Sequence, residues 1–191
     1  MIKAVLVSVL LFGVVSSVSA AEKAGVELPD SVRLEGAGQA LVLNGIGVRS
    51  KFIIDVYVAG LYLPQAESDA RTVIGSGWAN RVTMHFVYSK VSRDAMADAW
   101  RDGFEANLDR AALAGMESRL ASFIAMFPDL TEGSVVHLDY LPGRGTRVMI
   151  DSREAGIVEG ADFNAALLSV WLGEDPVTDS LKEALLGADR S

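Results

Sequence analysis

Cysteine is absent from the 191-residue chain, and histidine occurs only twice. Without cysteine the protein forms no disulfide, uses no thiolate nucleophile and binds no metal through sulfur. His85 and His137 lie far apart and lack the close spacing of a metal-binding pair. We therefore expect them to be sheet or surface histidines, and we predict no metal site and no cofactor.

Long apolar runs are also missing, except near the N-terminus. There, Lys3 precedes an apolar run over residues 4–15, and small residues follow up to Ala20 and Ala21. This pattern predicts a secretory signal peptide over residues 1–20, cut after Ala20 or Ala21, and the run is too short for a comfortable membrane span. We expect a periplasmic or secreted protein, with an uncleaved anchor as the alternative.

Basic residues are in deficit, with 17 Lys and Arg against 25 Asp and Glu and a net charge of -8. Removal of the signal peptide takes away Lys3 and no acid, which leaves a net charge of -9. Such a surface disfavours nucleic acid and anionic lipid as partners. The remaining residues 21–191 suffice for one domain with a sizeable core and are too few for two ordinary domains.

Hydrophobic periodicity divides those residues into strands and helices. Period-two alternation predicts strands over residues 52–63, 81–88, 135–141 and 146–151, whereas period-four apolar stripes predict helices over 93–108, 110–127 and 162–172. Residues 21–29 are expected to be mobile. Strands followed by helices, strands and helices indicate an α+β protein, in which a large antiparallel sheet carries helices on one face and is partly polar on the other.

The central stretch of the chain is residues 44–64. Strand alternation places Asp55 and Tyr57 on one face of the predicted strand, and Arg49 precedes it. Two interpretations follow: Arg49 pairs with Asp55 inside the sheet, or Arg49 holds an anionic or carbonyl group of a ligand. Gly45 and Gly47 permit either a sharp turn or a close backbone approach just ahead of that arginine.

A bulky helix face supplies another candidate. Ser92 is a suitable N-cap, and Met96, Trp100 and Phe104 then recur every fourth residue. The simplest interpretation is a helix packed on the sheet, although Trp100 could equally line a pocket between the two layers.

Two short motifs in the central stretch resemble the chalcone isomerase-like family. They are the turn Gly45-Ile-Gly-Val-Arg49, followed by Lys51-Phe52, and the run Val58-Ala-Gly-Leu-Tyr-Leu63. The order of elements after them agrees with that family over most of the chain. The resemblance implies an open-faced β-sandwich, in which a large antiparallel sheet carries a layer of helices and a ligand cleft lies between them.

The resemblance also assigns site residues. Arg49 falls on the arginine that positions substrate in the plant isomerases and contacts a carboxylate in the fatty-acid-binding members. Tyr57 stands where the isomerases have a catalytic threonine, and Arg93 and Trp100 lie near the place of their active-site tyrosine and asparagine. Because only the arginine of the isomerase site is retained, we assign no catalytic residue. The resemblance thus implies a protein that binds a small apolar carboxylate such as a fatty acid, and the signal-peptide pattern predicts that it is exported.

Three alternatives stay open at this level. The protein could be an isomerase of the chalcone isomerase type, an intramolecular lyase, which needs electrostatic or acid-base help. It could bind haem through His85, His137, a methionine or a tyrosine. Finally, it could be a structural or partner-binding envelope protein in which Arg49 only satisfies Asp55.

Overall fold

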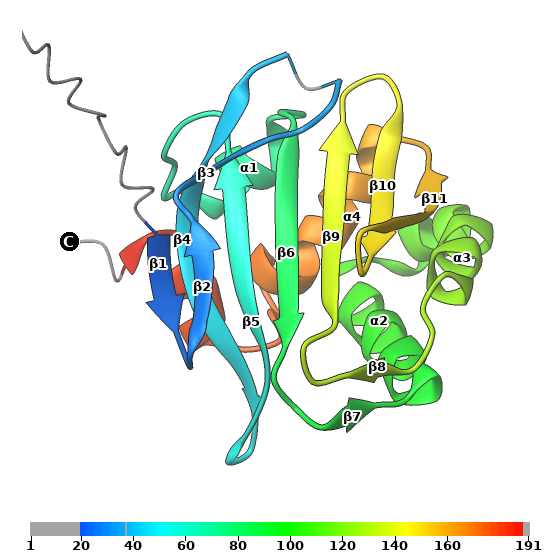
Figure 1. Cartoon of the computed structure of the whole chain (residues 1–191). Helices are drawn as coiled ribbons and strands as arrows, with labels where there is room; N and C mark the ends of the chain where they lie inside the picture. Colours follow the sequence, from blue (N-terminus) through cyan, green and yellow to red (C-terminus); the bar gives the residue numbers. More distant parts are fainter. Residues whose placement is uncertain (1–19, 37, 189–191) are drawn as a thin grey trace, which may run out of the picture.

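A large antiparallel sheet forms the centre of the protein in a computed structural model that describes residues 20–36 and 38–188. Its seven strands are ordered β11-β10-β9-β6-β5-β4-β3, and all neighbours run antiparallel (Figure 1). The strands are β3 (Ser31–Arg33), β4 (Ala40–Lys51), β5 (Ile54–Leu63), β6 (Asn80–Phe86), β9 (Val135–Leu141), β10 (Gly145–Ile150) and β11 (Arg153–Val158).

Within the described residues, five helices lie on one face of this sheet: α1 (Ala70–Gly75), α2 (Arg93–Asn107), α3 (Arg110–Ala125), α4 (Ala161–Leu172) and α5 (Asp179–Leu185). Ser92 begins α2 as predicted, because its side chain accepts a hydrogen bond from the backbone N–H of Ala95. Residues from both layers, such as Leu61, Met84 and Phe104, share one apolar core. The predicted α+β fold with one helical layer is confirmed.

The opposite face is covered in part by a hairpin of β1 (Ala20–Lys23) and β2 (Val26–Pro29) (Figure 1). Val26 and Leu28 are buried there in a second apolar cluster with Leu43 and Tyr62. The expectation that residues 21–29 are mobile was therefore wrong, because their alternate apolar side chains find a buried surface on the sheet. A further small pair, β7 (Lys90–Val91) with β8 (Leu130–Thr131), lies at one end of the fold.

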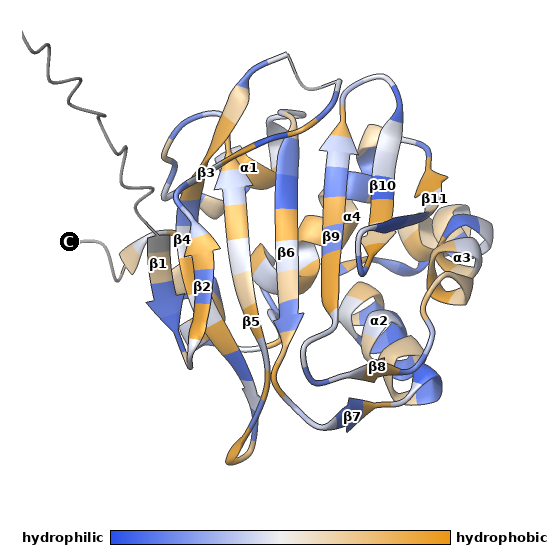
Figure 2. Ribbon diagram, viewed as in Figure 1, coloured by the Kyte–Doolittle hydropathy of each residue, from blue (hydrophilic) through white to orange (hydrophobic). Residues whose placement is uncertain are grey.

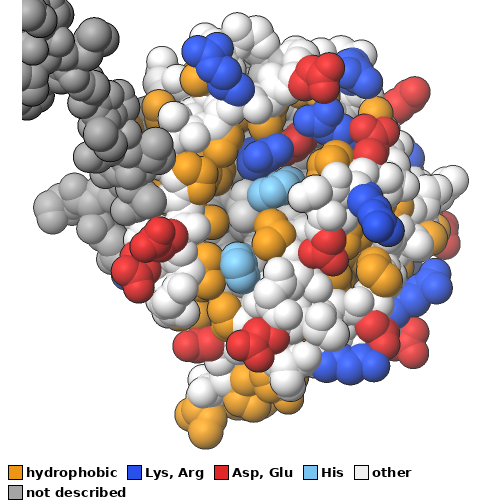
Figure 3. All heavy atoms as spheres, viewed as in Figure 1, with side chains coloured by type: hydrophobic (Ala, Val, Ile, Leu, Met, Phe, Trp, Pro, Cys, Tyr) orange, Lys and Arg blue, Asp and Glu red, His pale blue; other side chains and the backbone are white. Residues whose placement is uncertain are grey.

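The rest of this second face is polar, as expected. Asp139 is fully buried and accepts hydrogen bonds from Arg81 at 2.5 Å and from Arg147 at 2.9 Å. Beside them, Thr83 Oγ1 lies 3.0 Å from His137 Nδ1. Figure 3 shows the side chains of both histidines on this face, and one of them adjoins a basic group. Both histidines are sheet residues, which agrees with the prediction.

The predicted strand over residues 52–63 was wrong at its start. β4 continues to Lys51, the chain reverses at Phe52 and Ile53, and β5 begins only at Ile54. Phe52 has a φ of 57°, outside the range of strands. Aromatic and β-branched residues favour strands locally, but here the chain has to reverse so that β5 can pair with β4.

Gly45 and Gly47 allow a close approach between β4 and α5, and they do not form a sharp turn ahead of Arg49. A side chain at Gly45 would collide with the backbone oxygen of Ala184 in α5, and one at Gly47 would lie 2.8 Å from the Leu181 side chain. Both glycines therefore allow α5 to pack directly on β4.

Residues 1–19 lie outside the described part of the chain, so the signal peptide stays a prediction. Among the described residues, no helix combines the length and apolar character needed to span a membrane.

Candidate functional site

A cleft of about 760 Å³ opens between the sheet and the helical layer. Strands β4, β5 and β6 form one wall, and α2 with the segment after α4 forms the other. Most of its lining is apolar, including Val56, Met84, Phe86, Met96, Val170 and Val177. Arg49, Tyr57 and Trp100, three of the four predicted ligand-binding residues, also line this cleft.

Strand pairing brings Arg49 and Tyr57 together. Arg49 in β4 is the direct cross-strand partner of Tyr57 in β5, so both side chains belong to the same face of the sheet. Tyr57 in turn pairs with Phe86 in β6. The alternation of β5 points Tyr57, Ala59 and Leu61 toward the helices. The sheet thus sets a cation and a phenol side by side in an apolar wall.

Arg49 is half-buried, and its guanidinium donates a hydrogen bond to the backbone oxygen of Ser50. The pair with Asp55, one of the two interpretations of Arg49, is not formed: Asp55 is exposed and accepts a hydrogen bond from Ser50 Oγ at 2.6 Å. Among residues 20–36 and 38–188, no carboxylate forms an ion pair with Arg49. Because a guanidinium carries five N–H donors, several remain for an anionic group in the cleft.

Tyr57 is buried, and its hydroxyl accepts a hydrogen bond of 3.0 Å from Trp171 Nε1 in α4. An indole N–H can only donate, so the bond orients the phenol and leaves its own O–H free to donate. Burial raises the pKa of Tyr57 to about 12, against smaller opposing effects of the Trp171 bond and the Arg49 charge. Tyr57 is therefore a neutral hydrogen-bond donor at physiological pH.

Trp100 is only 2% exposed and packs edge-on against Phe123 and Trp171. Its buried Nε1 finds no hydrogen-bond acceptor within the described part of the chain. An unsatisfied buried donor costs about 1–3 kcal/mol. Trp100 is thus both a wall of the cleft, one of the two roles expected for it, and an unused donor.

Arg93 does not join these residues. It is exposed at the start of α2, and its backbone N–H donates to Asp129 Oδ1 at 2.8 Å. Two residues that contribute to the cleft were not predicted from the sequence. Lys51 lines the cleft beside Arg49, and its strand alternation with Arg49 could have indicated this. Trp171 orients Tyr57 from 114 residues away, and no local pattern could have signalled that contact.

Charges at the rim of the cleft are segregated. Lys51 of β4 lies on the strand side, and Lys90 of β7 pairs with Asp129 at 2.6 Å. Asp98 and Asp102 of α2 lie on the helical side. A ligand carboxylate is therefore favoured against the strands and disfavoured against α2.

Haem ligation by a histidine does not fit this cleft. His85 and His137 both belong to the polar face of the sheet, away from the helices, and neither lines the cleft. Burial, followed by the charge of Arg81, lowers the pKa of His137 to about 4. Within the described residues, no group of three or more His, Asp or Glu side chains is arranged to hold a metal ion.

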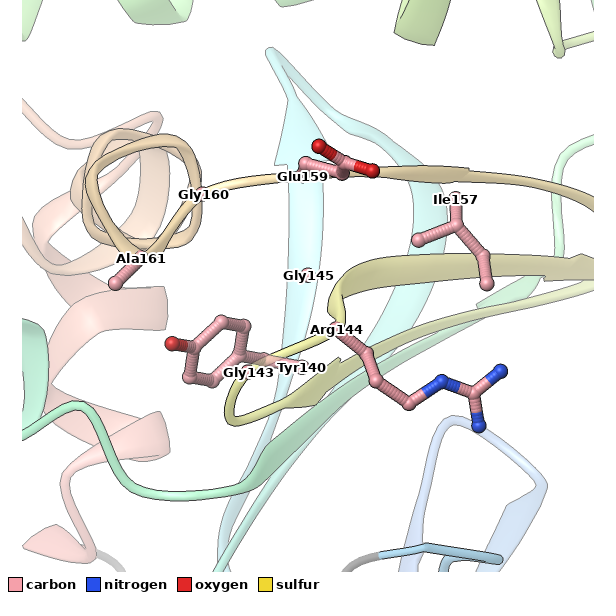
Figure 4. A pocket seen from close by; sticks show the side chains of 8 residues that line it. All are labelled: Tyr140, Gly143, Arg144, Gly145, Ile157, Glu159, Gly160 and Ala161. Carbon is pink, nitrogen blue, oxygen red and sulfur yellow. The ribbon is translucent and has the colours of Figure 1, made fainter.

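A second hollow of about 690 Å³ lies at the β9–β10 turn and the start of α4. Figure 4 shows the side chains of Tyr140 and Arg144 pointing away from one another, with Glu159 on a separate segment. Polar side chains that diverge in this way cannot bind the same group of a ligand. The cleft over Arg49 is therefore the better candidate.

Comparisons with known proteins point in the same direction as the geometry. A family model described as chalcone isomerase-like matches residues 20–187. Fatty-acid-binding protein 1 of Arabidopsis thaliana is 23% identical over 195 residues, which cover 86% of this chain and 67% of that protein. The crystal structure of an Arabidopsis thaliana fatty-acid binding protein matches with a TM-score of 0.67 at 19% identity, covering 88% of this chain and 96% of the other. At this identity, the structural match shows a shared fold.

Proposed function

We propose, since the chain belongs to the chalcone isomerase-like family, that its cleft binds a small apolar ligand with one carboxylate, such as a fatty acid, without chalcone isomerase activity. One observation carries the proposal: Arg49 and an oriented Tyr57 hydroxyl adjoin each other in an otherwise apolar wall. The relatives named above as fatty-acid-binding proteins support the same ligand class.

The head of such a ligand meets only donors on the strand side. Arg49 supplies charge-assisted hydrogen bonds, and Tyr57 donates its O–H. A carboxylate accepts hydrogen bonds and donates none when ionised, so it matches this pair. A neutral alcohol head would gain less, because it lacks the charge that a guanidinium prefers.

The tail of the ligand meets apolar side chains. Met84 and Phe86 line the strand side, and Met96 and Val170 line the helical side. The volume of the cleft lies within the range of about 300–1,000 Å³ typical of small-molecule pockets. Methionine side chains adapt to irregular shapes, which suits a flexible alkyl chain.

The absence of isomerase activity is part of the proposal. Arg49 could stabilise a developing oxyanion and Tyr57 could donate to it, but burial keeps Tyr57 protonated, so it cannot act as a general base. The sequence resemblance finds neither the tyrosine nor the asparagine of the isomerase site. Incubation with a chalcone should therefore give no ring closure above the uncatalysed rate, and turnover that disappears in Arg49→Ala would refute this part.

Displacement of a fluorescent fatty acid from the purified protein tests the binding. We expect Arg49→Ala to weaken binding about tenfold or more, since it removes a charged hydrogen-bond partner. Tyr57→Phe should weaken it severalfold, whereas Arg93→Ala, an exposed arginine outside the cleft, is the matched control and should have no effect. If fatty acids neither co-purify nor bind, or if Arg49→Ala binds like the control, the proposal fails.

We also propose that the protein is exported to the periplasm or secreted after removal of residues 1–20. The N-terminal charge, apolar run and small residues support this. Intact-mass measurement on protein from the periplasmic fraction should give an N-terminus at Ala21 or Glu22. Recovery of only the uncut chain from membranes would favour the anchor instead.

A further inference from the structure

The reversal between β4 and β5 carries an exposed apolar tip, residues 51–54, which we call the hairpin tip. Phe52 is 93% exposed and Ile53 is 97% exposed, the highest values among the large apolar side chains of the described residues. Figure 1 shows the hairpin extending beyond the neighbouring strands, and Figure 2 shows its end in the colour of hydrophobic residues. These two side chains stabilise no core.

The turn geometry makes these residues more unusual. Lys51 and Ile54 form the last pair of the ladder, so Phe52 and Ile53 alone make a two-residue loop. Phe52 has a φ of 57° at the first loop position, where a glycine is normally preferred in such loops. Folding stability therefore does not explain a phenylalanine at this position. Strain of this kind gathers at sites with a function.

The hairpin tip also borders the mouth of the cleft. Lys51 lines the cleft together with Arg49 of the same strand. Tyr88, another exposed aromatic residue, lines it too, and its backbone N–H donates to the oxygen of Val56 at 3.2 Å. Apolar groups exposed to solvent thus gather where a ligand would enter the cleft.

We propose that the hairpin tip inserts into the surface of a lipid bilayer with zwitterionic headgroups, so that the cleft opens toward the membrane. A narrow two-residue loop with two large apolar side chains can enter a yielding acyl layer, whereas it offers little area to a flat protein partner. Lys51 is the one charged residue of the tip, and its ammonium can meet lipid phosphates while its alkyl stem follows the inserted residues.

The net charge of the protein determines which lipid headgroups favour binding. The whole chain carries -8, so anionic membranes repel it and the apolar insertion has to supply the attraction. Binding should therefore be strongest on phosphatidylcholine and should weaken when phosphatidylglycerol is mixed in. The proposal goes beyond ligand binding and does not depend on it, because the tip can enter a bilayer whether or not the cleft holds a fatty acid.

Sedimentation with phosphatidylcholine vesicles tests the insertion, on proteins purified identically and with their N-termini checked by intact mass. Phe52→Ser and Ile53→Ser should each lower the partition coefficient about tenfold, the effect of withholding one large apolar side chain. Val42→Ser is the matched control, since Val42 is 40% exposed on β4, the strand that leads into the hairpin tip, but lies near the other end of that strand. It should partition like the parent protein.

Phe52→Gly separates a structural role from an insertion role. Glycine adopts the observed φ without strain, so this variant should melt at a higher temperature than the parent protein and yet lose vesicle binding. A purely structural phenylalanine would show the opposite: a lower melting temperature with unchanged binding.

Because the chain has no native cysteine, a dye attached to one introduced cysteine reports only the environment of the hairpin tip. An environment-sensitive dye on Ile53→Cys should shift its emission to the blue on phosphatidylcholine vesicles, and the same dye on Val42→Cys should not. Adding Phe52→Ser to the labelled chain should remove the shift. The proposal is overturned if the dye at residue 53 keeps its aqueous emission, if the serine variants partition like the control, or if the tip drives self-association in place of vesicle binding.

Discussion

Acid sensitivity of the fold should depend on one histidine of the polar sheet face. His137 is half-buried beside Thr83 and carries a pKa of about 4, because burial and the nearby Arg81 charge both disfavour its protonated form. Asp139 opposes this shift, but as a smaller effect. In the unfolded chain the same imidazole titrates at about 6.5. The folded protein therefore binds this proton less readily than the unfolded chain does.

The sign and the size of the effect follow from that difference. Between about pH 6.5 and about pH 4, the unfolded chain holds more protons, so the free energy of unfolding falls as the pH falls. A difference of about 2.5 pKa units corresponds to about 3 kcal/mol, and partial exposure of the ring reduces this to about 2 kcal/mol. Above about pH 6.5 this histidine takes nothing from the free energy of unfolding, and below about pH 4 the full loss has occurred.

Urea unfolding at a series of pH values measures this contribution. The His137→Gln variant keeps a polar group for Thr83 but does not titrate, so its free energy of unfolding should fall less than that of the parent protein between pH 6.5 and pH 4. His85→Gln, on the same face, is the control and should retain the parent's loss. If the two variants lose stability equally, the burial argument for His137 is wrong.

Other predictions concern packing and orientation within the fold. Trp171→Phe removes the donor that orients Tyr57, so displacement assays should show severalfold weaker fatty-acid binding, with a loss of about 1–2 kcal/mol in urea unfolding. Gly45→Ala drives a methyl group into the backbone of α5 and should cost about 2–4 kcal/mol of unfolding free energy, whereas Gly75→Ala meets open space and should leave the melting temperature nearly unchanged. Asp139→Asn removes a fully buried carboxylate and leaves two half-buried guanidiniums without their counter-charge, and calorimetry should show a loss of about 3 kcal/mol.

Helices were predictable because their determinants are local. Ser92 caps α2 through a residue three positions away, and the stripe of Met96, Trp100 and Phe104 is buried as its spacing predicts. Strand alternation over residues 81–88 likewise predicted the strand that forms β6. Such patterns depend on neighbours within one or two turns, so they can be read along the chain.

The turn at Phe52 shows where local preference misleads. Both loop residues favour strands, yet the ladder between β4 and β5 forces a reversal there. The pair between Arg49 and Asp55, one of two interpretations of Arg49, is not formed for a related reason. Sequence proximity suggested a partner, but the hairpin turns Asp55 to solvent and to Ser50.

The order of its residues determined most of this protein's secondary elements, its family and the choice of Arg49 as a candidate site residue, because propensity, capping and motif spacing act over short stretches of chain. Only the tertiary structure decided that Tyr57 adjoins Arg49 and that Trp171 holds the Tyr57 hydroxyl, since these contacts join strands and helices far apart in sequence. Strand register and helix packing create the cleft, and neither is encoded in any single segment.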